Sequence, residues 1–536
     1  MKKLRLPAFM LAFSMLLSAC GNNANDTSNT STEETNAPAT ETSEDVNENG
    51  GLMVLGISSD PTSVNPLYAN DRVSLTISNV LFDHPYKVEN GEIVYDGLAE
   101  SMEASEDFLT YTLKLKDGIK WHDGEPVTAD DFIFTYDSIL DDKQNAKGQN
   151  YLKTEDGAIE YTKIDDKTIE FKLPEVDTTF VEGISDISPI AKHIYEGEQD
   201  IAKSSKNQEP VGNGPFKFKE HKTGELYQVE RFEDYYGDVA KLDGVAYRVV
   251  PDANAREVAL ESGEISASYI DAEDAQKYEQ SGDYNIVSIE EGLLTNVFMR
   301  VNSEKLKDVK VRKAISYAID KEKLIQGAYG NESYAEPAYS PFSSNTTFYT
   351  DDVEKYEYDV EKAKELLKEA GASDLKLNLM YGSGNPQTEK ECLLIQEMLK
   401  QAGITVELVP LESSTFIEKL LDKENDELDL ASNGYVMGTN PYSYSAIFKS
   451  DSQENFSTYS NPEVDELFEK AKREIDDSKR EEIYKEIQQI LVDDAAQYSI
   501  ANVKKLVAVR KDFTNLEEAN PAPVHMFDYF NKIEKK

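Results

Sequence analysis

The sequence predicts an α/β protein built as two lobes, and two observations carry this prediction. A strand, helix, strand pattern occurs at residues 245–270 and again at residues 375–409. Each such crossover joins parallel strands of one sheet, so two separated crossovers predict two sheets, one for each lobe. The length of 536 residues also allows more than one folded unit.

The first crossover is predicted from the spacing of its apolar side chains. Residues 245–250 and 265–270 alternate between apolar and polar, as strands do. Residues 255–262 between them have helical spacing, with Val258 and Ala259 facing inward. This order of elements predicts a β-α-β unit.

The second crossover has the same order of elements. Residues 375–380 and 404–409 are its strands, and residues 387–402 are its helix, which Gly403 ends. Cys392 falls at an apolar-compatible position of this helix, so we expect a buried, unreactive thiol.

Capping residues predict further helices that serve as scaffold. Residues 309–319 carry apolar side chains at helical spacing. Short polar side chains at four later positions are suited to open helices, since they accept hydrogen bonds from free backbone N–H groups: Asp320, Asp359, Asn461 and Ser478.

A smaller α+β insertion is predicted at residues 85–203. Residues 111–116 and 168–173 alternate as strands. Trp121, the only tryptophan, lies between a strand and a turn, and we expect it to be a packing anchor rather than a sugar-stacking platform.

The N-terminus reads as an export signal followed by a lipid attachment site. Basic residues precede the apolar run 6–17, which is too short to span a bilayer. Leu17-Ser18-Ala19-Cys20 resembles a bacterial lipobox, in which the cysteine carries the lipid. We expect residues 1–19 to be a lipoprotein signal peptide and Cys20 to be the anchor. The alternative is an ordinary signal peptide with a chance cysteine.

Residues 20–50 are predicted to be a disordered acidic linker, because they are rich in Ser, Thr, Asn and Glu and poor in apolar side chains. The formal net charge of −46 argues against a nucleic-acid partner, which would need a basic surface. With one cysteine after Cys20, the folded body has no disulfide.

No pattern for catalysis or for a cofactor stands out. The five histidines lack metal-ligand spacing. A G-x-S-x-G elbow is absent, and the glycines at 212 and 214 lack the third glycine of a dinucleotide site. We therefore predict no catalytic residue, no metal and no cofactor.

Residues 99–137 read AESMEASEDFLTYTLKLKDGIKWHDGEPVTADDFIFTYD, and further motifs follow at 211–218, 308–315 and 358–367. This series closely resembles the peptide/nickel family (family 5) of extracellular solute-binding proteins that serve ABC importers. The resemblance runs from about residue 51 to the C-terminus. It implies a two-lobed periplasmic-binding-protein-like clamshell of type II, with an extra α+β domain inserted in the first lobe.

The resemblance also implies a division of the chain. Lobe one is expected to comprise residues 51–84, 204–295 and 500–536, the inserted domain residues 85–203, and lobe two residues 296–499. The chain would cross between the lobes twice, at a hinge that closes around a ligand.

One departure from the family pattern concerns the ligand. Many peptide binders of the family carry an Asp after a Gly-Trp or Gly-Tyr pair, where it pairs with the α-ammonium of the ligand. The matching segment here, Asn433 to Pro441, is expected to be a loop and contains no acid. A buried ammonium needs a carboxylate as its partner. Either another acid pairs with the amino terminus of the peptide, or the ligand has a different end group, or the ligand is not a peptide.

The expected function is that of a lipid-anchored receptor that captures oligopeptides and delivers them to a membrane-embedded ABC importer permease. We expect a monomer on the outer face of the membrane, held to the lipid bilayer through Cys20, in a Gram-positive cell. The alternatives are a receptor for a metal chelate or an oligosaccharide, and an anchored extracellular hydrolase. The predicted ligand-binding residues are Asn433, Gly434, Tyr435, Met437 and Gly438 in lobe two, Tyr68 and Asn70 in lobe one, and Asn296 at the hinge.

Overall fold

The computed structural model describes residues 51–89, 91–154, 157–330 and 333–536. The predicted signal peptide (1–19), the anchor Cys20 and the rest of the linker (20–50) all lie outside these residues. Within the described ranges, no helix combines the length and the apolar character that a membrane crossing requires.

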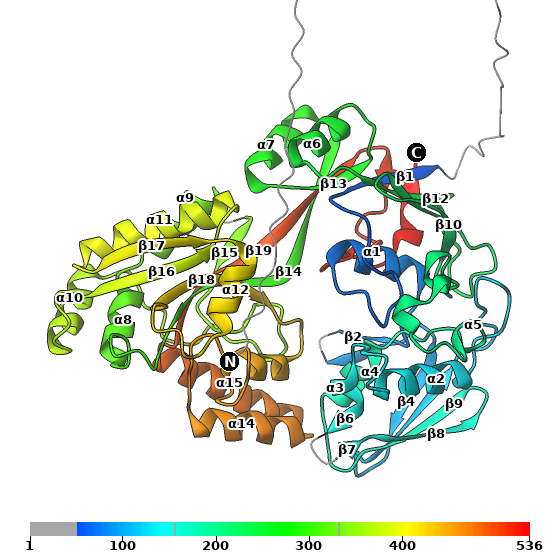
Figure 1. Cartoon of the computed structure of the whole chain (residues 1–536), viewed down its shortest axis with the longest axis horizontal. Helices are drawn as coiled ribbons and strands as arrows, with labels where there is room; N and C mark the ends of the chain where they lie inside the picture. The colour runs from blue at the N-terminus through cyan, green and yellow to red at the C-terminus, as the bar shows by residue number, and fades with distance from the viewer. Residues whose placement is uncertain (1–50, 90, 155–156, 331–332) are drawn as a thin grey trace, which may run out of the picture. The chain divides into compact units, whose positions relative to one another are not determined.

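An eleven-stranded mixed sheet runs through both halves of the described chain (Figure 1). The prediction of two separate sheets is therefore wrong, because hydrogen bonding continues from one crossover unit to the other. The strand order is β10 (Phe216–Lys222), β11 (Leu226–Arg231), β12 (Gly244–Val249), β1 (Leu52–Ile57), β13 (Ala267–Ile270), β19 (Gln497–Arg510), β14 (Tyr284–Met299), β18 (Leu430–Val436), β16 (Lys376–Gly382) and β17 (Thr405–Leu411), while β15 (Ala335–Pro337) pairs with β19.

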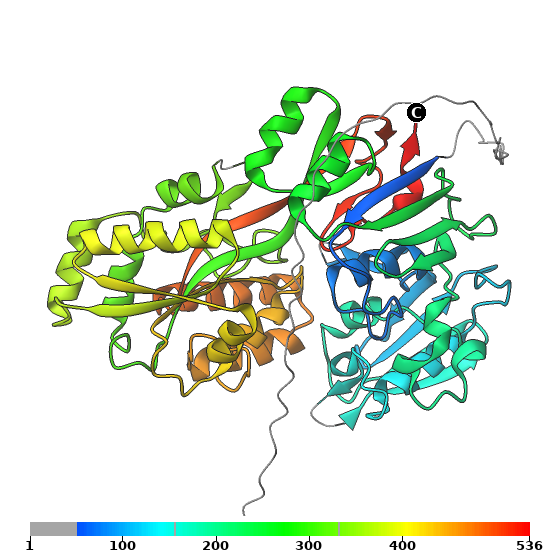
Figure 2. The same ribbon diagram turned by 45° about the horizontal axis from the view of Figure 1, so that its top comes forward.

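Two long strands, β14 and β19, carry the chain between the halves (Figure 2). Residues 284–289 of β14 pair with the part of β19 that also pairs with β13. Residues 293–299 of β14 pair with β18, and most of them pair with β19 on the other edge. The register of β14 against β19 shifts between Ile289 and Leu293, where Gly292 has a φ of +70°, and a second, shorter shift follows between Thr295 and Asn296. The first of these irregularities marks the passage from one half to the other.

The first half contains the predicted crossover at residues 245–270. Strands β12 and β13 both run parallel to β1, which lies between them, and α6 (Ala253–Glu261) connects them. The prediction for Val258 is wrong, since this side chain is 64% exposed, whereas Ala259 and Leu260 are buried. The helix starts two residues earlier than expected, after its cap Asp252, and turns its 259–260 edge inward.

The second half contains the other crossover, and here β16 and β17 pair directly and in parallel. Helix α11 (Pro386–Gln401) joins them and buries the free thiol of Cys392, as predicted. The predicted caps Asp320, Asp359 and Asn461 accept backbone N–H groups at the starts of α9 (Lys321–Tyr329), α10 (Val360–Glu369) and α14 (Pro462–Arg473). Helix α8 (Val309–Tyr317) matches its prediction, whereas α15 (Asp477–Asp493) is capped by Asp476 rather than by Ser478.

The segment predicted as an α+β insertion forms a separate antiparallel sheet in the order β4 (Ala99–Ala104), β5 (Thr110–Leu115), β9 (Thr168–Lys172) and β8 (Glu160–Asp165). Helices α2 (Ala129–Leu140) and α4 (Phe180–Ser185) pack with it. Trp121 is fully buried, as a packing anchor should be. The apolar side chains of the inserted segment belong to the same core cluster as those of the first half. The second half has two clusters of its own.

Candidate ligand-binding site

The predicted loop from Asn433 to Pro441 is partly strand. Residues 433–436 belong to β18, where Asn433 lies opposite Asn296 of β14. Apolar residues at 430, 431 and 435 are buried and keep the strand in the sheet, so the loop begins at Met437. Asn296 is fully buried, and its side-chain amide donates to the backbone oxygen of Leu294 at 2.8 Å.

Tyr435 is a buried member of the sheet. Its hydroxyl donates to the backbone oxygen of Pro341 and accepts a hydrogen bond of 2.8 Å from the Gln497 side chain, which also donates to Asn296 at 2.9 Å. Burial raises the pKa of this hydroxyl well above its usual value. The ligand contacts of Tyr435 and Asn296 stay a prediction.

The turn after β18 is held by a neighbouring loop. Met437 is half-buried, and Gly438 is exposed with a φ of +71°. Thr346 Oγ1 donates to the Gly438 oxygen at 3.4 Å, and the Thr347 N–H donates to the Thr439 oxygen at 2.9 Å. These bonds give the turn a defined shape in which its backbone groups can approach a ligand.

Tyr68 and Asn70 lie between β1 and α1 (Arg72–Leu81) in the first half. Lys147 fixes this segment, because its Nζ donates to the Ala69 oxygen at 2.7 Å. The Tyr68 hydroxyl has no hydrogen-bond partner within the described part of the chain, and burial, reinforced by Asp200, raises its pKa to about 12. Asn70 is exposed. Tyr68 and Asn70 thus lie together in the first half, whereas the predicted site residues of β18 and its turn lie in the second half.

An ion pair that the sequence did not reveal connects the start of α1 to the crossing strands. Arg72 binds the carboxylate of Glu291 with two nitrogens, one at 2.8 Å, and donates to the Tyr269 hydroxyl at 3.3 Å. Glu291 is 4% exposed and lies within the register shift of β14. Because the two residues are distant in sequence and carry no motif, only the fold identifies the pair.

Two carboxylates of the inserted domain lie near each other, and one of them, Glu182, contacts the turn after β18. Thr439 Oγ1 donates to Glu182 Oε1 at 3.2 Å, and the Tyr151 hydroxyl donates to Asp186 Oδ2 at 3.0 Å. Burial, with a smaller contribution from Asp186, raises the pKa of Glu182 to about 7. Asp186 is exposed, and desolvation by the surrounding residues raises its pKa, partly offset by the hydrogen bond from Tyr151. Among 102 acids, nothing in the sequence singles these out.

One small cavity lies in the second half, and another lies at the passage between the halves. One is lined by buried polar groups that include Lys321 and Gln497. The other adjoins the register shift and is lined by Gly292, Asn345 and Lys504. No cluster of His, Cys, Asp and Glu suited to hold a metal occurs in the ranges that the structure describes.

Comparison with known proteins places these features in a family. Residues 94–456 match the model described as bacterial extracellular solute-binding proteins, family 5, middle region. The chain is 33% identical to the oligopeptide-binding protein AppA of Bacillus subtilis, over 83% of this chain and 85% of that protein.

Solved structures agree over the whole described body. The ABC transporter substrate-binding protein CtaP of Listeria monocytogenes is 40% identical, with a TM-score of 0.88 over 91% of this chain and 99% of that one. AppA of Bacillus subtilis, solved with a nonapeptide, is 29% identical, with a TM-score of 0.74 over 91% of this chain and 99% of that one. These neighbours confirm the two-lobed, periplasmic-binding-protein-like α/β fold. The chain belongs to family 5 of the bacterial extracellular solute-binding proteins.

Proposed function

We propose that this protein is a lipid-anchored receptor that captures oligopeptides between its two lobes and delivers them to an ABC importer permease. The observation that carries the proposal is its likeness, across the whole body, to a protein solved with a nonapeptide. The register shift in β14, where the paired strands pass between the halves, supports a hinge at that point. Ligand capture then requires binding and closure without chemistry.

The proposed division has lobe one at 51–84, 204–295 and 500–536, the inserted domain at 85–203, and lobe two at 296–499. Support comes from the core clusters, since the large cluster of lobe one contains no residue of 296–499, and the only buried residues of lobe one in the clusters of lobe two are the boundary residues Leu294, Ile500 and Ala501. The register shift lies at 289–293, close to the proposed boundary at residue 296.

The ligand is proposed to lie along the predicted site residues of β18 and its turn, opposite Tyr68 and Asn70. The exposed, positive-φ Gly438 leaves backbone groups of the turn open to a peptide main chain. For the α-ammonium of the peptide, Glu182 and Asp186 replace the missing acid of the 433–441 segment. Glu182 accepts a hydrogen bond from Thr439 of this turn and Asp186 lies near Glu182, and an ammonium would offset the desolvation that raises their pKa values.

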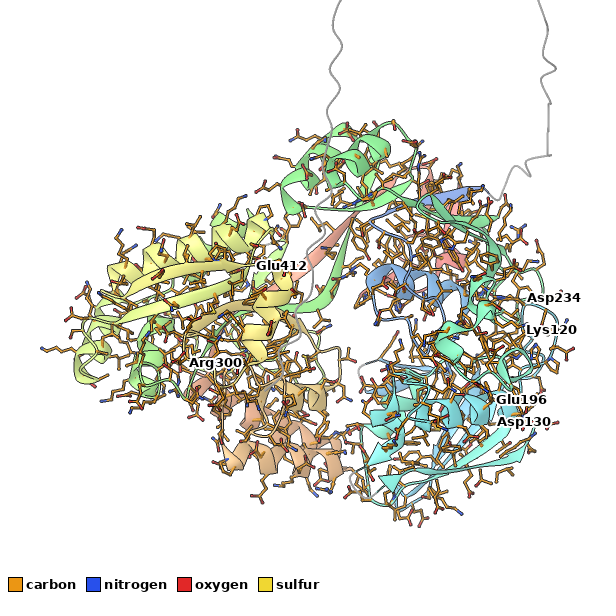
Figure 3. All side chains as sticks on the ribbon, in the orientation of Figure 1. Lys120, Asp130, Glu196, Asp234, Arg300 and Glu412 are labelled. Atoms are coloured by element: carbon orange, nitrogen blue, oxygen red, sulfur yellow. The ribbon has the colours of Figure 1, made fainter. Side chains whose placement is uncertain are left out.

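Calorimetry with a defined peptide mixture, and with single peptides carrying a free or an acetylated amino terminus, tests this proposal. The wild-type protein should bind peptides with a free amino terminus more tightly, and Asp186→Asn combined with Glu182→Gln should remove most of that preference. The control is Glu196→Gln, since Glu196 lies on the outer side of the inserted domain (Figure 3). Absence of peptide binding, together with a co-purified ligand of non-peptide mass, would overturn the proposal.

The lipid anchor is a separate part of the proposal, supported by the lipobox-like run that ends at Cys20. Several acyl chains on one residue hold a protein at a membrane far more firmly than a single chain does. Wild-type protein should incorporate labelled palmitate and fractionate with membranes, and Cys20→Ser should abolish both. Incorporation that survives the substitution would refute the anchor while leaving peptide binding untouched.

A further inference from the structure

The last turn of α14 is capped by a residue of the inserted domain. Both the N–H and the Oγ1 of Thr178 donate to the backbone oxygen of Lys472, at 2.9 and 3.0 Å. Carbonyl groups at the end of a helix lack partners within the helix, so an outside donor is well placed there. The end of α14, in the second half, is thus capped by Thr178 of the inserted domain, which belongs to the first half.

Opposite charges reinforce the same contact. Lys472 Nζ lies 3.2 Å from Asp177 Oδ2, and Arg473 Nε donates to Glu175 Oε2 at 2.8 Å. The Asp177 and Lys472 side chains are 10% and 20% exposed, so solvent screens this pair less than a free surface pair. The positive groups also suit the C-terminal end of a helix dipole.

Local bonds hold both partners in position. Asp177 Oδ1 accepts hydrogen bonds from the N–H and Oγ1 of Thr179, at 2.9 and 2.7 Å, which orients the 175–178 segment. On α14, Glu469 lies 3.7 Å from Arg473 and accepts a hydrogen bond of 2.6 Å from Lys449. The contact therefore joins two preorganised surfaces.

We propose that residues 175–178 form a latch that fastens the inserted domain to the end of α14 and holds the two lobes together. Figure 1 shows α14 at the lower edge of the second half, whereas β14 and β19 cross to the first half near the top of the view. A contact between the two halves at a distance from the crossing strands must break when the lobes separate. The latch consequently slows ligand release while leaving capture by the open form unchanged.

Charge reversal tests the latch. Arg473→Glu and Glu175→Arg each place like charges in contact, and the double variant restores an opposite pair. Two measurements apply in a Cys20→Ser background: the distance between labels on cysteines placed at exposed Glu106 and Glu365, and the dissociation rate of a bound peptide. Each single variant should lengthen the distance and raise the dissociation rate about 10-fold, with the association rate within about 2-fold, and the double variant should recover most of both.

The matched control is the reversed pair Lys120→Glu and Asp234→Lys. This pair is also exposed and spans 3.0 Å, and Figure 3 shows it on the outer surface, remote from α14. Reversing it should change neither distance nor rates. The rate measurement rests on the proposed peptide ligand, but the distance measurement needs no ligand, so absence of peptide binding leaves the latch testable. Wild-type distances in both single variants, or no recovery in the double variant, would overturn the latch.

Discussion

Gln497 and Tyr435 are joined side chain to side chain within the sheet, by a hydrogen bond of 2.8 Å from the Gln497 amide to the Tyr435 hydroxyl. Gln497 stands at the start of β19 and Tyr435 on β18, with β14 between them. The same amide also binds Asn296 of β14, so one side chain ties three strands of lobe two together. This network supports the strand end from which the turn at Met437 projects.

Removing the Tyr435 hydroxyl should therefore weaken the protein. Tyr435→Phe leaves the Pro341 oxygen without its donor and the Gln497 amide with one acceptor fewer, and we expect a loss of about 1–2 kcal/mol in the free energy of unfolding. Urea denaturation measures the loss. Met437→Ala is the companion variant and should act mainly on ligand affinity. Unchanged stability of Tyr435→Phe would contradict the supporting role.

Glu391 should make stability depend on pH. Its buried carboxyl accepts hydrogen bonds of 2.8 Å from Tyr329 and Ser432, and desolvation raises its pKa. Because the folded state favours the protonated carboxyl, its stabilising effect is complete below the unfolded pKa of about 4.3 and is lost as the pH rises through the folded pKa. Glu391→Gln should thus gain melting temperature relative to wild type between pH 5 and pH 9.

The control for that experiment is Glu397→Gln, on the exposed face of the same helix. It should follow the wild-type pH dependence. A Glu391→Gln curve parallel to the wild-type curve would show that the buried carboxyl does not titrate in this range.

Glu182 should make lobe closure depend on pH. Its pKa is raised to about 7 in this structure, chiefly by burial, and separation of the lobes would rehydrate it. The structure with Glu182 buried is thus favoured at low pH, and this advantage is lost as the pH rises through about 7. In ligand-free protein, the label distance between Glu106 and Glu365 should increase from pH 5.5 to pH 8.5. Glu182→Gln should flatten this change, whereas an equally steep change in the variant would assign it to another group.

Gly292 should control the hinge. A Cβ on this residue would lie 2.8 Å from the amide atoms of Asn345, and the φ of +70° disfavours any side chain by about 1–2 kcal/mol. Gly292→Ala should therefore lower stability and alter the rate of closure, measured by the relaxation of the label distance after rapid mixing with ligand. Gly384→Ala is the control, since it has a positive φ with open space around it. Equal effects of the two substitutions would mean that backbone strain alone explains them, and would contradict a special role of Gly292 in the hinge.

Local sequence patterns predicted helices and strands well where a single kind of interaction decides the local structure, such as a side chain that caps a helix. Asp320, Asp359 and Asn461 cap helices as expected, because a short acceptor before an apolar run has few competing roles. The apolar alternation at 375–380 and 404–409 likewise gave β16 and β17. Joining both lobes into one sheet was not predictable, since the pairing of β14 with β19 depends on residues about two hundred positions apart.

The candidate site shows the same limit. Asn433 and Asn296 meet across two strands, but their spacing in the sequence carries no trace of the register that joins them. Glu182 and Arg72 could not be selected from an acidic, charge-rich chain, because their importance arises from what burial and tertiary neighbours do to their charges. The resemblance to a family directed the search for ligand-binding residues to the turn after β18. The structure then identified the side chains that contact this turn, among them Thr346 and Glu182.

The register shift at residues 289–293 has a mechanical consequence. Along the regular parts of β14 and β19, bending would stretch backbone hydrogen bonds, but at this step, and again between Thr295 and Asn296, the ladder is already interrupted. Motion can concentrate there without breaking pairs on either side. The two lobes can then turn as rigid bodies on a pivot only a few residues long, and the free energy of binding goes into bringing surfaces together rather than into deforming the sheet.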